Sequence, residues 1–98
     1  MKLVGVEVIE EGQKRHADAA NRLSAWRAEV TSETTIWKSF QDVRARYPAT
    51  DKVGDRYVFD IGGNRYRLIV KINFAVGVVA VRWFGTHAEY DKIKVEEI

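Results

Sequence analysis

Three side chains near the end of the chain have the types and the spacing for acid–base chemistry: His87, Tyr90 and Asp91. Positions i, i+3 and i+4 share one side of a helical turn, so we expect the three side chains to face the same way. A histidine can take or give a proton near neutral pH. Asp91 would orient its ring, while Tyr90 would bond to a phosphate oxygen or stack on a base. A lone histidine without a catalytic role fits the same spacing.

A short helical turn would position these residues. Thr86 and Glu89 have the spacing of a capping box, which predicts a turn from Thr86 to about Ile93. Capping alone explains both residues, so we assign no chemistry to them. The free backbone N–H groups at the start of the turn would present partial positive charge to a bound phosphate.

Three segments before this turn, 56–61, 65–72 and 79–84, alternate between two kinds of residue and are predicted to be strands. Alternation of period two places their apolar residues on one face of a sheet, which helices would cover. We expect Val79, Val81 and Trp83 on this covered face. The second face would collect four cations and one aromatic ring: Arg65, Arg67, Lys71, Arg82 and Phe84.

This second face has two interpretations. Arginine forms forked contacts with phosphate and an aromatic ring stacks on unpaired bases, which favours an RNA-binding surface. A solvated sheet face would carry the same residues. Asp60 supports the second interpretation, because it would pair across the strands with Arg65 or Arg67.

A tight turn is predicted between the first two strands, because glycine and asparagine accept positive φ. If Gly62-Gly63 is the loop, Phe59 pairs with Tyr66. If Gly63-Asn64 is the loop, Phe59 pairs with Leu68. Both registers keep the same residues on each face, since side chains alternate with period two.

The first third of the chain indicates helices. Residues 2–6 fit a short strand, and residues 8–15 are ambiguous because Gly12 weakens a helix. Helical spacing is clear in 17–30, where the apolar stripe contains Leu23, Trp26 and Val30.

A second helix is predicted over Phe40–Arg46. Ser39 and Asp42 resemble an acidic capping box at its start, and Pro48 ends it. Residues 49–55 are predicted to be a loop. Helices followed by strands predict an α+β fold.

The composition limits the alternatives. The 98 residues suffice for a single domain over 1–98, and the net charge of +2 permits a nucleic-acid partner without requiring one. The absence of cysteine excludes disulfides and cysteine-based zinc sites. We see no membrane span, signal peptide, phosphate-binding loop or nucleophile elbow, and His16 with Asp18 does not make a metal site. We therefore expect a soluble cytoplasmic protein without a metal or cofactor.

Two runs of residues, Gly63–Ile69 and Arg82–Lys92, closely resemble the HigB-type toxins of type II toxin–antitoxin modules. The similarity covers most of the chain and is weakest before Ala17. Four upstream segments follow the same order: Ala25-Trp26, Trp37, residues 42–48 and residues 56–59. The resemblance implies a RelE-like fold, a small, mostly antiparallel sheet packed on N-terminal helices with a short C-terminal helical turn.

The resemblance also implies an activity and partners. The expected activity is metal-independent cleavage of mRNA on the translating ribosome, in which a 2′-hydroxyl attacks the adjacent phosphate and translation stops. The expected partner is a HigA-like helix-turn-helix antitoxin, and operator DNA would be bound only through the complex of the two proteins.

Roles for the candidate residues follow from this resemblance. The residues expected to be catalytic are His87, Arg67, Arg82 and Tyr90. Those expected to bind RNA are Arg65, Lys71, Phe84 and Lys92, with Asp91 orienting His87. Two other functions stay open: a non-catalytic RNA-binding module, and an interaction module that binds only an antitoxin and its operator.

Overall fold

The computed structural model describes residues 1–98 and contains one five-stranded sheet in the order β1-β5-β4-β3-β2. The strands are β1 (Lys2–Val4), β2 (Asp51–Val53), β3 (Arg56–Ile61), β4 (Tyr66–Asn73) and β5 (Val78–Thr86). β1 is parallel to β5, and every other neighbouring pair is antiparallel. The predicted α+β class and mostly antiparallel sheet are confirmed, and the architecture is compatible with a RelE-like fold.

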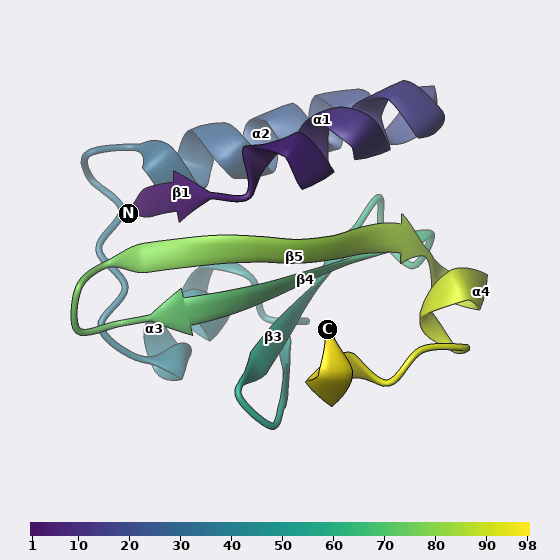
Figure 1. Ribbon diagram of the computed structural model, residues 1–98. Coiled ribbons are helices and arrows are strands. Elements are labelled where there is room, and N and C mark those ends of the chain that lie inside the picture. The colour runs from purple at the N-terminus through teal and green to yellow at the C-terminus, as the bar shows by residue number, and fades with distance from the viewer.

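Four α-helices and two short 3₁₀ turns accompany the sheet, and Figure 1 shows α1 and α2 side by side. They are α1 (Val6–Arg15), η1 (Ala17–Ala19), α2 (Ala20–Thr31), α3 (Phe40–Arg46), α4 (His87–Tyr90) and η2 (Val95–Glu97). The ambiguous stretch 8–15 is therefore helical. A Cβ atom on Gly12 would lie only 2.5 Å from a ring carbon of Phe84. The glycine that weakens the helix signal is needed for the close approach of β5 to α1.

Two local predictions were wrong. Residues 51–53 form the edge strand β2 instead of a loop, and Asp51 lies opposite Val58. Three residues are too few to show alternation, so the sequence carries no strand pattern there. The Ser39 side chain makes no capping bond. Asp42 instead accepts a hydrogen bond from the Lys38 backbone N–H at 2.8 Å, one residue before the expected donor.

The β3–β4 hairpin adopts the second of the two predicted registers, in which Phe59 lies opposite Leu68. Gly62 and Gly63 both have φ near +67°, a conformation that glycine adopts without strain. The same register places Asp60 directly opposite Arg67.

The main hydrophobic core lies between the helices and the covered face of the sheet. Its aromatic centre is Phe59, whose ring meets Trp26 edge-on at 5.3 Å and Tyr47 at 5.3 Å and stacks near Trp37 at 6.3 Å. Burial and the charge of Glu29 raise the pKa of Tyr47 to about 12. The core has 17 buried residues: Ile9, Ala19, Leu23, Trp26, Val30, Trp37, Val43, Tyr57, Phe59, Ile61, Tyr66, Leu68, Val70, Ile72, Val79, Val81 and Phe84.

A second, smaller cluster lies on the opposite face of the sheet. Val58 and Ile69 are buried there under Val95 of the C-terminal segment, residues 91–98. Figure 1 shows this segment (yellow) running back from α4 toward β3. The buried Arg56 secures it, because its Nε donates a hydrogen bond to the Ile98 main-chain oxygen at 2.8 Å. The C-terminal segment therefore covers part of the second face, which neither interpretation of that face included.

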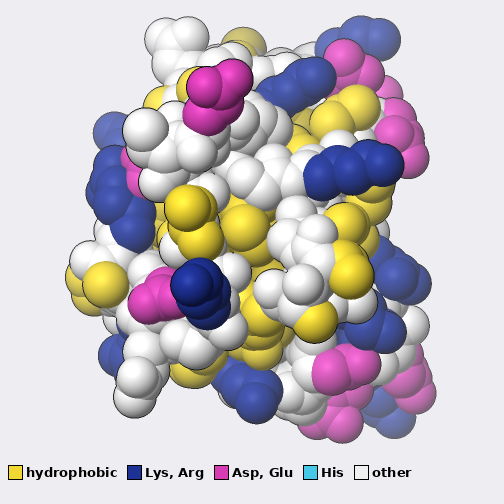
Figure 2. All heavy atoms as spheres, turned by 90° about the vertical axis from the view of Figure 1, so that its left-hand side faces the viewer, with side chains coloured by type: hydrophobic (Ala, Val, Ile, Leu, Met, Phe, Trp, Pro, Cys, Tyr) yellow, Lys and Arg dark blue, Asp and Glu magenta, His cyan; other side chains and the backbone are white.

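Figure 2 shows the end of the molecule that carries the N-terminus and the β4–β5 turn. Hydrophobic side chains reach the surface there among charges of both signs. Two of the large exposed hydrophobic residues are Ile36, in the α2–α3 loop, and Val76, in the β4–β5 turn. α4 lies at the other end of β5, so this surface is remote from His87. No helix is both long enough and apolar enough to cross a bilayer.

Candidate active site

The α4 turn begins with the predicted capping box. Thr86 Oγ1 accepts a hydrogen bond from the Glu89 backbone N–H at 3.1 Å, and Glu89 Oε1 accepts one from the Thr86 backbone N–H at 2.8 Å. This second bond lowers the pKa of Glu89. The backbone N–H of His87 donates to the Arg65 carbonyl at 2.9 Å. The turn is thus held by hydrogen bonds between its own residues and by one to Arg65, just before β4.

His87 and Asp91 lie on the same side of the turn, as their spacing predicts. The His87 Nε2 atom is 3.9 Å from an Asp91 carboxylate oxygen, which is too long for a hydrogen bond. The Nδ1 atom is buried without a hydrogen-bond partner, although 45% of the side chain is exposed. Asp91 can attract the charged imidazolium ring but does not fix its orientation by a hydrogen bond.

Arg67 is the most constrained cation of the candidate site. Its Nε lies 3.2 Å from Asp60 Oδ1, its Nη2 donates to Asn64 Oδ1 at 2.7 Å, and its Nη1 donates to the Tyr66 carbonyl at 3.2 Å. The pairing with Asp60 that the alternation allowed is therefore present. A guanidinium has five N–H donors, so each terminal nitrogen keeps a second N–H without a protein acceptor.

Tyr90 lies against this guanidinium. The centre of its ring is 5.8 Å from the Arg67 Cζ atom and 6.4 Å from the Trp83 ring. The ring also packs on the small cluster that contains Val58 and Ile69. Burial, followed by the negative charge of Asp51, raises the pKa of Tyr90. Its hydroxyl therefore stays protonated at neutral pH and can donate a hydrogen bond, but cannot act as a base.

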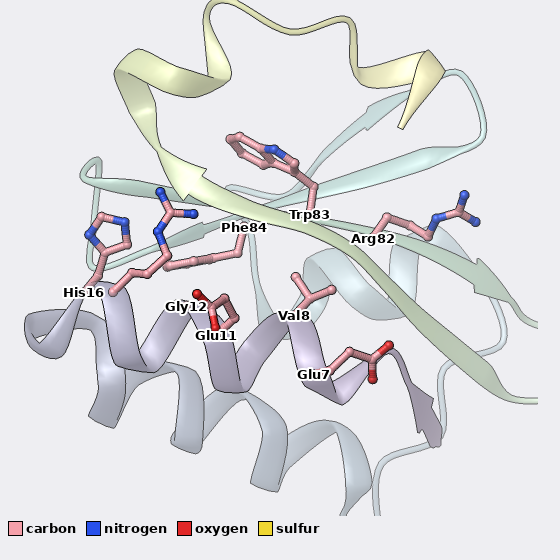
Figure 3. Close-up of a pocket in the computed structure, with 9 residues that line it drawn as sticks. Glu7, Val8, Glu11, Gly12, His16, Arg82, Trp83 and Phe84 are labelled. Carbon is pink, nitrogen blue, oxygen red and sulfur yellow. The ribbon is translucent and has the colours of Figure 1, made fainter.

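A β-bulge in β5 corrects the predicted faces of this strand. Ile69 lies opposite Trp83 and Val70 lies opposite Val81, so Arg82 has no partner residue. The extra residue reverses the alternation beyond it. Figure 3 shows Phe84 pointing toward α1 and Trp83 pointing away toward the C-terminal segment. The assignments of Phe84 to the RNA-binding face and of Trp83 to the main core were both wrong.

Arg82 lines a groove of about 300 Å³ between α1 and β5. The polar side chains of α1 that share the groove are Glu7, Glu11 and Arg15, and the adjoining His16 also lines it. Arg82 is exposed and makes no ion pair or side-chain hydrogen bond. Its strand position is also distinct from that of Arg67, which lies opposite Gly85. The structure therefore separates these two arginines along β5, whereas the alternation predicts only that they share a face.

The remaining predicted cations are dispersed. Arg65 belongs to the hairpin turn, is 72% exposed and pairs with Asp18 at 3.0 Å on the helix side of the sheet, which corrects its expected place. Lys71 lies on the second face as predicted and is 3.4 Å from an Asp55 oxygen. The buried Ile69 separates Lys71 from Arg67 along β4. Lys92 is exposed just beyond α4.

Sequence reasoning missed two residues that shape this region. Asn64 was treated only as a turn residue, although its amide holds Arg67. Asp18 was set aside, but it accepts hydrogen bonds from Tyr66 Oη at 2.6 Å and from Arg65. The bond from Tyr66 lowers the pKa of Asp18. Neither contact has a local signal, because each joins residues whose approach depends on the fold. No three His, Asp or Glu side chains come together as a metal site would require.

Comparison with known proteins matches residues 19–93 to a family described as HigB toxin, the RelE-like toxic component of a toxin–antitoxin system. The chain is 33% identical over 97 residues to the mRNA interferase HigB of Escherichia coli O6:H1, which covers 95% of this chain and 91% of that protein. It is 30% identical over 87 residues to the mRNA interferase toxin HigB of Escherichia coli K12, which covers 81% and 84%. The family match spans β2 to β5 and the α4 turn described above.

Proposed function

Because the chain belongs to the HigB family of RelE-like toxins, we propose that it is an endoribonuclease that cleaves mRNA and thereby inhibits translation. One observation carries the proposal: the Arg67 guanidinium and the Tyr90 ring lie together beside the turn that begins with His87. This arrangement offers a cation, a neutral hydroxyl donor and a proton-transfer group within one short segment of the fold. We further propose that residues 1–98 act as one toxin domain.

The proposed reaction needs the RNA, these side chains and water. The 2′-oxygen bonds to the adjacent phosphorus, the bond to the 5′-oxygen breaks, and the products are a 2′,3′-cyclic phosphate and a 5′-hydroxyl. The 2′-hydroxyl loses a proton and the departing 5′-oxygen gains one. His87 would transfer one of these two protons, and water would exchange the other. Arg67 would stabilise the charge on the pentacoordinate phosphorus, and the Tyr90 hydroxyl would hold a phosphate oxygen.

The other cations would bind the RNA on either side of the cleaved phosphate. Arg82 is free of protein partners, so it would add positive charge from the groove beside α1. Arg65, Lys71 and Lys92 would hold flanking phosphates at the hairpin, along β4 and beyond α4. Buried Ile69 and the C-terminal segment prevent the RNA from lying straight along β4 from Arg67 to Lys71.

The family also supports proposals about partners. We propose that a HigA-like helix-turn-helix antitoxin neutralises the protein in the cytoplasm, that operator DNA is bound only through this complex, and that the mRNA is cut on the translating ribosome without a metal. A basic chain with a pI of about 9.0 suits a ribonucleoprotein substrate.

The test compares induction of wild type, His87→Ala and Lys14→Ala in a bacterial host, with mapping of mRNA 5′ ends. Lys14 is an exposed residue of α1 and serves as the control. We expect growth arrest and new 5′ ends for wild type and Lys14→Ala, and neither for a folded, well-expressed His87→Ala. An equally active His87→Ala would overturn the role of His87 alone. A wild type that neither arrests growth nor cuts mRNA would overturn the proposed function and leave a binding module.

A further inference from the structure

We propose that Asp60 is a positioning residue of the ribonuclease site, and that it acts only by fixing the orientation of the Arg67 guanidinium. The inference rests on the proposed function, in which Arg67 stabilises charge on the reacting phosphate. Asp60 itself would touch neither the RNA nor the reacting atoms.

The geometry of Arg67 supports this role. Two of its nitrogens donate hydrogen bonds, to Asn64 and to the Tyr66 carbonyl, and its Nε lies 3.2 Å from Asp60 Oδ1 in an ion pair. Asn64 and Tyr66 belong to the turn and the strand start just before Arg67. Asp60 is the partner that comes from the neighbouring strand, directly opposite Arg67. Two hydrogen bonds and a carboxylate on a third side of a planar group restrain its tilt as well as its position.

Burial separates this ion pair from the others in the chain. Only 11% of the Arg67 side chain and 30% of the Asp60 side chain are exposed. The arginines of the pairs Asp18–Arg65 and Glu29–Arg46 are mostly exposed, so water competes with the carboxylate in those pairs. The other buried arginine, Arg56, pairs with Asp55, whose side chain is 64% exposed, and also bonds to the main chain at Ile98, which holds the C-terminal segment.

The Tyr90 ring also restrains the orientation of the Arg67 guanidinium, and this orientation matters for the proposed chemistry. Tyr90 lies on one side of Arg67, within cation–π distance. With the two hydrogen bonds, the Asp60 carboxylate and this ring in place, the N–H groups of Arg67 that remain free have a fixed direction. A pre-oriented donor stabilises a developing charge more than one that must reorganise during the reaction. Loss of Asp60 removes the cross-strand ion pair and leaves the guanidinium held by its own hairpin and the Tyr90 ring alone, so its orientation is less restricted.

A double-mutant cycle tests the inference, using wild type, Asp60→Ala, Arg67→Ala and the double variant. We would measure the mRNA cleavage rate at saturating toxin in a purified translation system, together with the toxin concentration that gives half of that rate. We expect Asp60→Ala to lower the saturating rate about 10- to 100-fold, the size of effect that a small misplacement produces. The half-saturating concentration should change little, and the double variant should be no slower than Arg67→Ala.

Two further variants make the test more specific. Asp60→Asn retains an oxygen near Arg67 Nε, so we expect a smaller loss of rate and the same non-additivity with Arg67→Ala. This variant replaces Asp60→Ala in the cycle if Asp60→Ala does not fold. Glu10→Gln removes a carboxylate from the exposed Arg27–Glu10 ion pair between α1 and α2 and should leave the rate unchanged.

The outcomes are distinct. If Asp60→Ala slows cleavage by the same factor in the wild-type and Arg67→Ala backgrounds, Asp60 acts independently of Arg67 and the inference is wrong. An unchanged rate for a folded Asp60→Ala also overturns it. Absence of cleavage by wild type overturns the proposed function, and the inference with it.

Discussion

The two faces of the sheet are built from different kinds of residue. The helix-covered face contributes to a core of 17 buried residues with an aromatic centre, whereas on the opposite face Val58 and Ile69 form a cluster of only three buried residues with Val95 of the C-terminal segment. Charged groups such as Asp60, Arg67 and Lys71 occupy the remainder of that second face. The first face therefore supplies most of the burial that stabilises the fold, and the second face can hold partly buried charges close to solvent.

This difference explains where the candidate site lies. An arginine inside the main core would need a buried partner of opposite charge among the aromatic rings, and removing both charges from water costs free energy. On the second face, Arg67 has two hydrogen-bond acceptors, a paired carboxylate and one ring beside it, at the margin of a small apolar cluster. The residues that contribute most to stability and the candidate catalytic residues thus lie on opposite faces of the same sheet.

The largest effect should come from the aromatic centre of the main core. Phe59→Ala removes a ring that contacts Trp26, Trp37 and Tyr47 and leaves a cavity, so we expect a loss of about 3–5 kcal/mol in the free energy of unfolding. Urea denaturation followed by tryptophan fluorescence measures it. Ile36→Ala, at an exposed position, is the control and should change the free energy little. A loss below about 1 kcal/mol for Phe59→Ala would contradict the division between the faces.

An intermediate effect is expected on the second face. Val95→Ala removes two buried methyl groups above Val58 and Ile69, which corresponds to about 1–2 kcal/mol. Because the segment it belongs to is held mainly by this cluster and Arg56, amide hydrogen exchange should accelerate in residues 91–98 while the main core stays protected. Uniform acceleration across all strands would show instead that the two clusters unfold as one unit.

The smallest effect concerns acid stability. The pKa values of Asp18 and Glu89 are lowered in the folded state, by the hydrogen bond from Tyr66 and by the bond to the Thr86 backbone. Lowered carboxyl pKa values contribute stability that is present above the unfolded value near 4 and is lost as the pH falls through the folded values. Both groups are exposed, so the loss should be small and weaker at high salt. Urea denaturation between pH 6 and pH 3 measures it, and Asp18→Asn should flatten the dependence. A steeper dependence for Asp18→Asn would contradict the assignment.

Local patterns predicted much of this molecule. The helix Phe40–Arg46, the capping box at α4 and the faces of β3 and β4 all follow from neighbours a few residues apart. The candidate site was predicted in part on the same basis, since His87, Tyr90 and Asp91 belong to one turn and Asp60 was expected to pair with Arg65 or Arg67.

Features that depend on distant segments were not predicted. The packing of the C-terminal segment over Ile69 and the contacts of Arg65 with Asp18 bring together residues far apart in sequence. The bulge at Arg82 cannot be seen in the pattern of residue types. With or without the bulge, one aromatic ring, Trp83 or Phe84, points toward the helices. Side-chain type alone therefore cannot identify which ring is buried.

The bulge also bears on how this strand tolerates change in length. Deletion of the single codon for Arg82 would restore regular pairing between β4 and β5, and would keep Trp83 opposite Ile69 and Phe84 opposite Leu68. Phe84 would remain the ring that approaches Gly12, where even a methyl group has no room. Loss of one residue should therefore be accepted more readily at position 82 than at Trp83 or Phe84, so differences of one residue in length among relatives should fall at this point of β5.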